Sequence, residues 1–159
     1  MLNKLQALPA GRRPWDVANF ASWLSVAKVH HACEMALSAA LEPLGLSPSQ
    51  YDIMANLART PGLAQGELVR RLLVGKSAVS MTIPDLERRG LVTRDRDPGD
   101  GRIRRLALTE KGAALTERAL AAHAVILEVM GSRSEPGDAA AVEAAMGRIY
   151  EALKAAREG

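Results

Sequence analysis

Hydrophobic residues recur at helical spacing along most of this chain, and they alternate with polar residues in only one short stretch. Residues 16–42 form the longest helical pattern, and apolar side chains cover too many of its sides for a lone surface helix. Pro43 and Gly45 then interrupt the pattern. The sequence therefore predicts one long N-terminal helix that packs against a partner.

The next helix has a well-marked beginning at residues 47–50. Ser47 is suited to cap it, Pro48 occupies the first helical position, where its missing N–H costs nothing, and Gln50 can complete a capping box. Residues 60–62, which read Thr-Pro-Gly, end this helix.

Two shorter helical patterns follow, at about 64–73 and 76–89. Val74 and Gly75 form a turn between them, and Gly90 stops the second helix. Two short helices joined by a tight turn that contains glycine are typical of a helix-turn-helix. We expect the second helix to be a recognition helix that enters the major groove of DNA.

The alternating stretch comes directly after this pair. Residues 91–94 and 103–108 predict two β-strands, and residues 97–101, Asp-Pro-Gly-Asp-Gly, have the composition of a tight turn. Leu106 and Leu108 alternate with more exposed positions, as in a half-buried strand. The pattern predicts a two-stranded hairpin with arginines at its tip, the wing of a winged helix-turn-helix.

Two further helices are predicted toward the C-terminus, over 110–130 and 138–157. Thr109 caps the first, and residues 131–137 separate the two. Together with residues 16–42 they are three segments rich in Ala and Leu that would expose large apolar stripes in an isolated chain. A symmetric homodimer whose terminal helices interlock would cover these stripes.

Composition favours a mainly helical protein of the cytoplasm. Hydrophobic residues make up 48% of the 159 residues but aromatic residues only 3%, so the core must be built from Ala, Leu, Val, Ile and Met. Cys33 is the only cysteine, which excludes an internal disulfide and suits a reducing compartment. No apolar run is long enough to span a membrane, and residues 1–15 lack the features of a signal peptide.

Positive charge is concentrated near the predicted wing. The formal net charge is only +3, yet seven arginines face three acidic residues between Arg88 and Arg105. Such clustering on a short element is the electrostatic footprint of a surface that binds the phosphates of double-stranded DNA.

Three segments resemble the MarR-type winged helix-turn-helix transcriptional regulators: LSPSQYDIMANLARTPGLAQGELVRRLLVGKSAVS (46–80), LERRGLV (86–92) and DPGDGRIRRLALTEKG (97–112). The last is the most specific, because a D-P-x-D-x-R turn followed by a strand and L-T is unusual by chance. The resemblance implies a mainly α fold, a winged helix-turn-helix with a two-stranded β wing, flanked by N- and C-terminal dimerisation helices. It also implies a dimeric regulator, often a repressor released by small phenolic ligands, oxidants or metals.

On this resemblance, residues 1–15 are a flexible N-terminal arm and residues 16–159 a single MarR-type domain. Residues 16–45 and 109–159 are then the dimerisation helices, and residues 46–108 the DNA-binding lobe. We expect a sequence-specific DNA-binding transcriptional regulator, a ligand-responsive homodimeric repressor of a pseudo-palindromic operator, with no cofactor, no enzymatic activity and no membrane partner. The alternatives are a non-enzymatic protein-interaction module on a winged-helix dimer, and a metal- or redox-sensing variant of the regulator.

Two positions depart from the family pattern. The family's recognition helix often ends V-D-R-L-E, whereas residues 83–87 read Ile-Pro-Asp-Leu-Glu, so Pro84 replaces the usual acid and Asp85 lies one position later. The family's acid often braces the wing arginine, and this role cannot simply be carried over to Asp85. A proline inside a helix removes a hydrogen bond at a cost of about 3 kcal/mol, so we expect a kink there or a helix whose N-terminal half is re-aimed. Gly101 replaces a common arginine at the wing tip.

The expected DNA contacts lie on the recognition helix and on the wing. Arg102 is the first candidate, because an arginine at the wing tip can enter the minor groove, which is most negative in narrow A/T-rich DNA. The alternative is an ion pair of Arg102 with Asp97 or Asp100. The full set of candidates is Gln65, Lys76, Ser77, Ser80, Met81, Thr82, Arg94, Arg102 and Arg104.

An effector pocket would use the few aromatic rings that carry a polar group. These are Trp15, Trp23, His30 and Tyr51. A small, planar, anionic aromatic compound is the ligand that such a set favours, although Trp23 and Tyr51 suit a plain core role equally. Glu34 lies four residues after His30, a workable metal-ligand spacing, and His123 on a later helix could join them. No second ligand cluster accompanies them, so no metal site is assigned.

Overall fold

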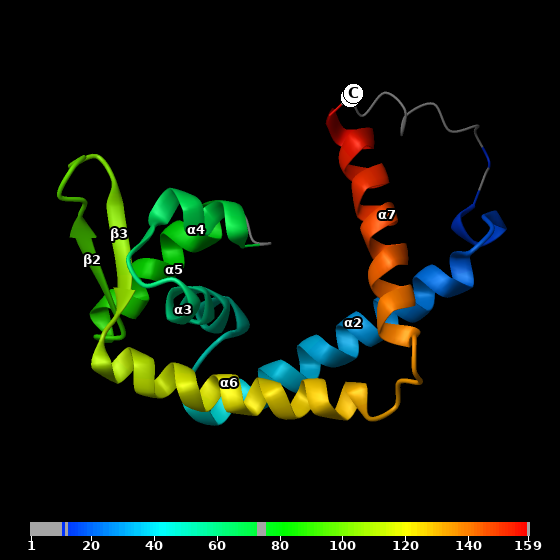
Figure 1. Cartoon of the computed structure of the whole chain (residues 1–159), viewed down its shortest axis with the longest axis horizontal. Helices are drawn as coiled ribbons and strands as arrows, with labels where there is room; N and C mark the ends of the chain where they lie inside the picture. Colours follow the sequence, from blue (N-terminus) through cyan, green and yellow to red (C-terminus); the bar gives the residue numbers. More distant parts are fainter. Residues whose placement is uncertain (1–10, 12, 73–75, 159) are drawn as a thin grey trace. The chain divides into compact units, whose positions relative to one another are not determined.

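The computed structural model describes residues 11, 13–72 and 76–158, with the side chains of 76–78, 157 and 158 left aside. Its elements, drawn in Figure 1, run in the order η1 (Pro14–Asp16), α2 (Phe20–Leu41), η2 (Glu42–Leu44), α3 (Pro48–Arg59), β1 (Leu63–Ala64), α4 (Gln65–Arg71), α5 (Lys76–Arg88), β2 (Val92–Arg96), β3 (Arg104–Leu108), α6 (Glu110–Gly131) and α7 (Asp138–Glu158). The mainly α winged-helix fold predicted from the sequence is confirmed. The predicted turn at Val74 and Gly75 lies outside the described residues, as does most of the arm over 1–15.

The chain divides into two compact units, each described here by itself. We call residues 31–127, which contain the DNA-binding lobe predicted over 46–108, the lobe, and residues 1–30 with 128–159 the terminal unit. The buried hydrophobic side chains of the described chain all belong to the lobe, where α3, α4, α5, the sheet and the start of α6 share one core. Its largest fully buried members are Leu41, Ile53, Met54, Leu57, Leu68, Ile83, Leu86, Leu91 and Leu106.

Local sequence signals set the boundaries of the lobe's helices. At the start of α3, the backbone N–H of Gln50 donates to Ser47 Oγ (3.2 Å), and the backbone N–H of Ser47 donates to Gln50 Oε1 (2.8 Å). These two bonds confirm the predicted capping box. Gly90 follows α5 with φ +66°, in the left-handed region that glycine adopts without strain. Thr109 Oγ1 accepts from the Gly112 amide (2.9 Å) and caps α6, as predicted.

The sheet has one more strand than the sequence predicts. β2 and β3 form the expected antiparallel hairpin, with Val92 opposite Leu108 and Arg96 opposite Arg104. In addition, β1 pairs with the other edge of β3, so the order is β1-β3-β2. The prediction gave residue 64 to a helix, because a strand of two residues has no periodicity and its partner lies some forty residues later in the chain.

Helix α2 begins later than predicted. The chain forms the 3₁₀ turn η1 first, and Asn19 has φ 71°, so the helix starts at Phe20 rather than near residue 16. Of the apolar residues on this helix, only Leu41 is buried within the single chain. Among the helices that the structure describes, none combines the length and apolar character needed to cross a membrane.

Helix α5 continues through Pro84 without interruption. Because proline has no N–H, the carbonyl of Ser80 lacks its usual partner four residues later. Val79, Ile83 and Leu86 are each at most 1% exposed, so this face of α5 is anchored in the core on both sides of the proline. Packing of the buried face thus offsets the lost backbone hydrogen bond.

Candidate nucleic-acid interface

The turn at the tip of the wing is held together by two aspartates. Asp97 Oδ1 accepts from the backbone amides of Gly99 (2.8 Å) and Asp100 (2.9 Å), and its other carboxylate oxygen pairs with Arg105. Asp100 Oδ1 accepts from the Arg102 amide (2.9 Å). The Arg105 contact, supported by the two amides, lowers the pKa of Asp97 below its ordinary value. The carboxylates thus fix the backbone of this five-residue turn.

Arg102 projects from this fixed turn with an exposed side chain. The Asp97 carboxylate forms an ion pair with Arg105, and the Asp100 carboxylate accepts from the backbone N–H of Arg102 rather than from its guanidinium. Within the part of the chain that the structure describes, no carboxylate pairs with the Arg102 side chain, so the ion-pair alternative is not realised.

Three wing arginines share one face of the hairpin. Arg96 lies directly opposite Arg104, and Arg94 is two residues before Arg96, so their side chains leave the sheet on the same side. Like charges directly opposite one another destabilise a hairpin unless an anion neutralises them. Arg96 was not among the predicted contacts, although its period-two spacing from Arg94 is visible in the sequence. This triad is suited to bind phosphate.

Arg105 has a different role on the other face. Besides Asp97, its guanidinium binds the carbonyl oxygen of Gly62 (2.9 Å), next to β1. Among the residues that the structure describes, Arg104 contacts only the carbonyl oxygen of Gly101, at 3.4 Å. Of these two neighbouring arginines, Arg105 therefore ties the wing to the segment before β1, and Arg104 is the one left for a ligand.

The exposed face of α5 carries Ser80, Met81 and Pro84, while Thr82 is half-buried. The Lys76 and Ser77 side chains lie outside the described part of the chain. Gln65, the remaining predicted contact, is the first residue of α4 and is half-buried.

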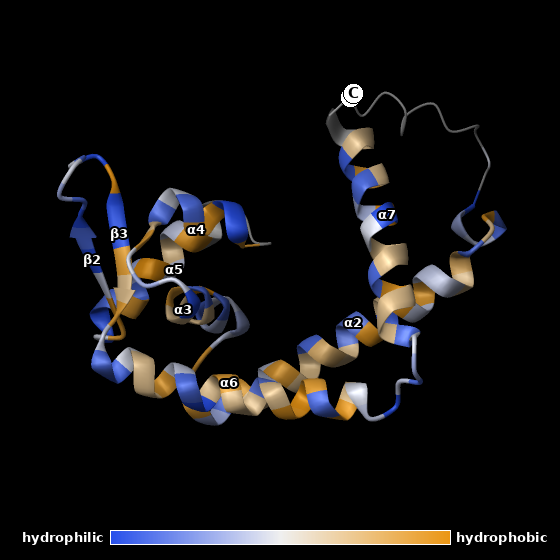
Figure 2. Ribbon diagram, viewed as in Figure 1, coloured by the Kyte–Doolittle hydropathy of each residue, from blue (hydrophilic) through white to orange (hydrophobic). Residues whose placement is uncertain are grey.

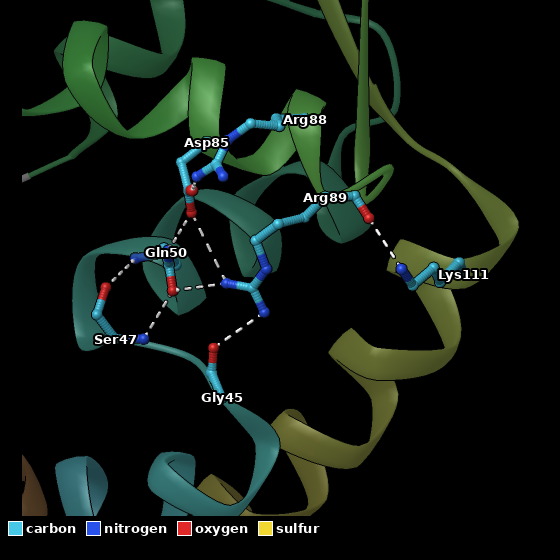
Figure 3. A network of polar contacts seen from close by, with 7 residues as sticks. All are labelled: Gly45, Ser47, Gln50, Asp85, Arg88, Arg89 and Lys111. Atoms are coloured by element: carbon cyan, nitrogen blue, oxygen red, sulfur yellow. Dashed lines mark hydrogen bonds and ion pairs between the residues drawn. The ribbon is translucent and has the colours of Figure 1, made fainter.

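A network of polar contacts holds the C-terminal end of α5, as Figure 3 shows. Asp85 Oδ2 accepts from Gln50 Nε2 (2.8 Å), and Asp85 also pairs with Arg88 and with Arg89 (3.8 Å). Arg89 in turn donates to Gln50 Oε1 (3.2 Å) and to the carbonyl of Gly45 (2.9 Å). Asp85 therefore braces α5 against the start of α3, not against the wing.

The same network reaches α6. Lys111 Nζ donates to the carbonyl oxygen of Arg89 (2.9 Å), directly beyond the end of α5. The C-terminal end of α5 is thus held by side chains from α3 and from α6. The sequence patterns that mark helix ends did not predict these contacts.

A partly buried aromatic pair, Tyr51 and His123, joins α3 to α6. The Tyr51 hydroxyl and His123 Nδ1 are 2.7 Å apart, with the rings edge to face. Burial, and secondarily the charge of Asp52, raises the pKa of Tyr51, and burial raises the pKa of Asp52 although His123 opposes it. Tyr51 is only 3% exposed, so its hydroxyl is already engaged inside the lobe.

The residues predicted for an effector pocket divide between the two units. Trp15, Trp23 and His30 belong to the terminal unit and are exposed, whereas Tyr51 belongs to the lobe. Trp23 stacks on Phe20 (5.8 Å between ring centroids) and lines an apolar hollow of about 480 Å³. The pocket made from these four residues remains a prediction.

A second hollow, of about 630 Å³, lies within the lobe between the end of α2 and the start of α3. Met35, Ser38 and Glu42 line one side, and residues 45–48 the other. Sequence reasoning did not find it, because no pattern marks where two helices diverge. As for metals, the described residues contain no group of three His, Cys, Asp or Glu side chains placed to hold an ion.

Known proteins share both sequence and fold with this chain. Residues 44–103 match the sequence model of the MarR family. The HTH-type transcriptional repressor Rv2887 of Mycobacterium tuberculosis is 38% identical over 83 residues, which cover 52% of this chain and 60% of that protein. The match therefore spans less than two thirds of that relative's length.

Two solved structures extend the likeness over most of the chain. AbsC, a MarR family transcriptional regulator from Streptomyces coelicolor, is 25% identical with a TM-score of 0.78, covering 85% of this chain and 93% of AbsC. The S. aureus MepR–DNA complex is 21% identical with a TM-score of 0.75, covering 82% of this chain and 96% of MepR, and shares the fold. The predicted resemblance is confirmed: residues 44–103, which include the winged helix-turn-helix, match the MarR family.

Proposed function

We propose that this chain is a sequence-specific DNA-binding transcriptional repressor that acts as a homodimer on a pseudo-palindromic operator. The observation that carries this proposal is the wing. The Arg102 side chain has no carboxylate partner among the described residues, and Arg94, Arg96 and Arg104 share one face, with Arg96 directly opposite Arg104. A surface of this kind is stabilised by binding phosphates.

In this proposal α5 lies in the major groove and the wing contacts the adjacent backbone or minor groove. The candidate contacts on α5 and α4 are Gln65, Lys76, Ser77, Ser80, Met81 and Thr82, and those on the wing are Arg94, Arg96, Arg102 and Arg104. With one lobe per half-site, the two half-sites would lie about 10 bp apart, centre to centre. Relatives named as repressors support the direction of regulation.

Dimerisation is supported by the terminal unit. On α7, Val142, Met146, Ile149 and Leu153 are all exposed and follow a spacing of four, three and four residues, so they form one apolar stripe. An isolated chain would leave this stripe in water. We assign residues 16–45 and 109–159 to dimerisation and residues 46–108 to DNA binding.

An effector would act by shifting the separation of the two lobes, which requires different affinities for the DNA-binding and free states. The apolar hollow beside Trp23 and the one between α2 and α3 are the places that we propose for a small aromatic or anionic effector. The proposal contains no catalytic step and no cofactor.

The test is fluorescence anisotropy with duplex DNA from upstream of the protein's own gene, titrated with salt beside an unrelated duplex. We expect tight, salt-dependent preference for the upstream duplex. Arg102→Ala should weaken binding to every duplex and reduce the salt slope by about 1, whereas Ser80→Ala should alter base preference. Arg118→Ala, an exposed arginine on α6, is the matched control. Binding to neither duplex at any salt concentration would favour the protein-interaction module instead.

A further inference from the structure

The exposed face of the recognition helix carries two apolar side chains at positions where a DNA-binding surface would be expected to carry charge. Met81 is 79% exposed, more than any other large hydrophobic residue that the structure describes. Pro84, one turn later, is also exposed, and Ser80 beside them is uncharged. The wing, in contrast, carries Arg94, Arg96, Arg102, Arg104 and Arg105.

The fold does not require these two side chains. Val79, Ile83 and Leu86 already fill the core from the opposite face of α5. Met81 and Pro84 are three residues apart, so they share a face and are separated by about 4.5 Å along the helix axis. In the free protein this apolar surface is in contact with water, at a cost that a ligand covering it would remove.

The major groove offers one apolar group, the C5-methyl of thymine. Charged side chains bind phosphates or guanine, and amides read adenine, whereas a thioether and a pyrrolidine ring can do neither. A separation of about 4.5 Å exceeds the rise of one base pair, about 3.4 Å, so the two side chains can meet methyl groups on neighbouring or next-neighbouring base pairs.

We infer that Met81 and Pro84 read thymine methyl groups and make each half-site thymine-specific at two nearby positions. This inference rests on the proposed DNA-binding function. It also explains the position of Pro84. This proline removes a backbone hydrogen bond from α5, and it places a rigid apolar ring on the surface that would face the bases.

The experiment removes only the methyl group. Full-length protein first selects its preferred site from a library of randomised duplexes. Each thymine of the selected site is then replaced singly by deoxyuridine, and binding is measured by fluorescence anisotropy. We expect about a fourfold loss of affinity at each of two thymines per half-site, the effect of one buried methyl group, and no loss elsewhere.

The variants assign each methyl group to a side chain. Met81→Ala should bind the thymine and uracil duplexes equally at one of these positions, and Met81→Leu should keep the discrimination. Pro84→Ala should abolish it at the other position. Arg102→Ala, in contrast, should bind more weakly but keep both thymine-to-uracil ratios. Thermal unfolding by circular dichroism shows whether each variant is folded.

Two results would overturn the inference. If the selected duplex binds equally well with uracil at every position, or if Met81→Ala keeps the wild-type ratios, the methyl groups are not read by this face, although the repressor assignment stands. If the library yields no preferred duplex, the proposed function falls and the inference falls with it.

Discussion

The lobe and the terminal unit are built from similar residues but bury them to very different extents. In the lobe, side chains such as Leu57, Leu68 and Leu106 are at most 1% exposed. In the terminal unit Trp23 is 62% exposed, and Leu153 is 58% exposed. Figure 2 shows hydrophobic residues along α2 and α7 as well as in the lobe, so the difference lies in packing rather than in composition.

This contrast shows which part of the chain completes its own core. A helix with an apolar stripe is stabilised mainly by packing that stripe against another element. The lobe provides such packing within one chain, through residues that contact each other from α3, α5 and the sheet. The terminal unit leaves the apolar stripe of α7 exposed to water, and we therefore expect a second copy of the chain to cover this stripe.

The largest expected effect comes from a charge in the α7 stripe. Ile149→Asp would bury an unpaired carboxylate in the proposed dimer interface, so the dimer should dissociate at least about 100-fold more readily. Operator binding should be lost with it, whereas the lobe should keep its fold. Sedimentation equilibrium and anisotropy measure the two effects.

Ala155→Asp is the matched control, because it places the same charge on a nearly opposite side of α7. This variant should remain dimeric. Dissociation by both variants, or by neither, would contradict the assignment of the stripe to the interface.

The stability of the lobe can be lowered separately by a substitution at Gly112. A Cβ there would lie 1.9 Å from the carbonyl oxygen of Leu91, a backbone atom that cannot move aside. Gly112→Ala should therefore lower the free energy of unfolding by about 3 kcal/mol. Gly66→Ala, where a Cβ meets no atom within 4 Å, should cost nothing or stabilise α4 by less than about 1 kcal/mol. Urea denaturation compares them, and equal stabilities would refute the predicted clash.

A smaller effect is expected from the pair that joins α3 to α6. Tyr51→Phe removes the hydroxyl bound to His123 and should cost about 1 kcal/mol in the lobe's free energy of unfolding. The exposed Tyr150 of α7 provides the control, since Tyr150→Phe should change stability by less than about 0.5 kcal/mol. If both variants unfold at the same urea concentration, the hydrogen bond contributes nothing.

The smallest effect concerns the pH dependence of the wing. Because the pKa of Asp97 is lowered in the folded state, its contribution to stability is present above the ordinary aspartate pKa and is lost as the pH falls through the lowered value. Amide hydrogen exchange at Gly99 and Asp100 should speed up over that acidic range, relative to amides in α3. Asp97→Asn should abolish this pH dependence, and a pH profile unchanged by the substitution would show that another group is responsible.

Signals that act over a few residues predicted much of the lobe. Ser47 and Gln50 form their capping box, Gly90 follows α5 and Thr109 caps α6, because in each case the interacting groups are close in sequence. The wing turn belongs to the same class, since Asp97 binds amides two and three residues later.

Features that depend on distant partners were missed. Strand β1 forms through its pairing with β3, and the Asp85 carboxylate accepts a hydrogen bond from Gln50, 35 positions earlier in the sequence. Two other misses have different causes.

The start of α2 was placed too early because the left-handed backbone at Asn19 follows no hydrophobic pattern. Arg96 was missed although its alternation with Arg94 is visible in the sequence, and only its position opposite Arg104 required the structure.

The most direct test of this account is sedimentation equilibrium of the full-length chain, alone and with its selected duplex. If the terminal units pair and each lobe reads one half-site, the protein alone will sediment as a dimer and the complex will contain two chains per duplex. A monomer at micromolar concentration that binds as one chain per duplex would contradict the division of roles between the two units.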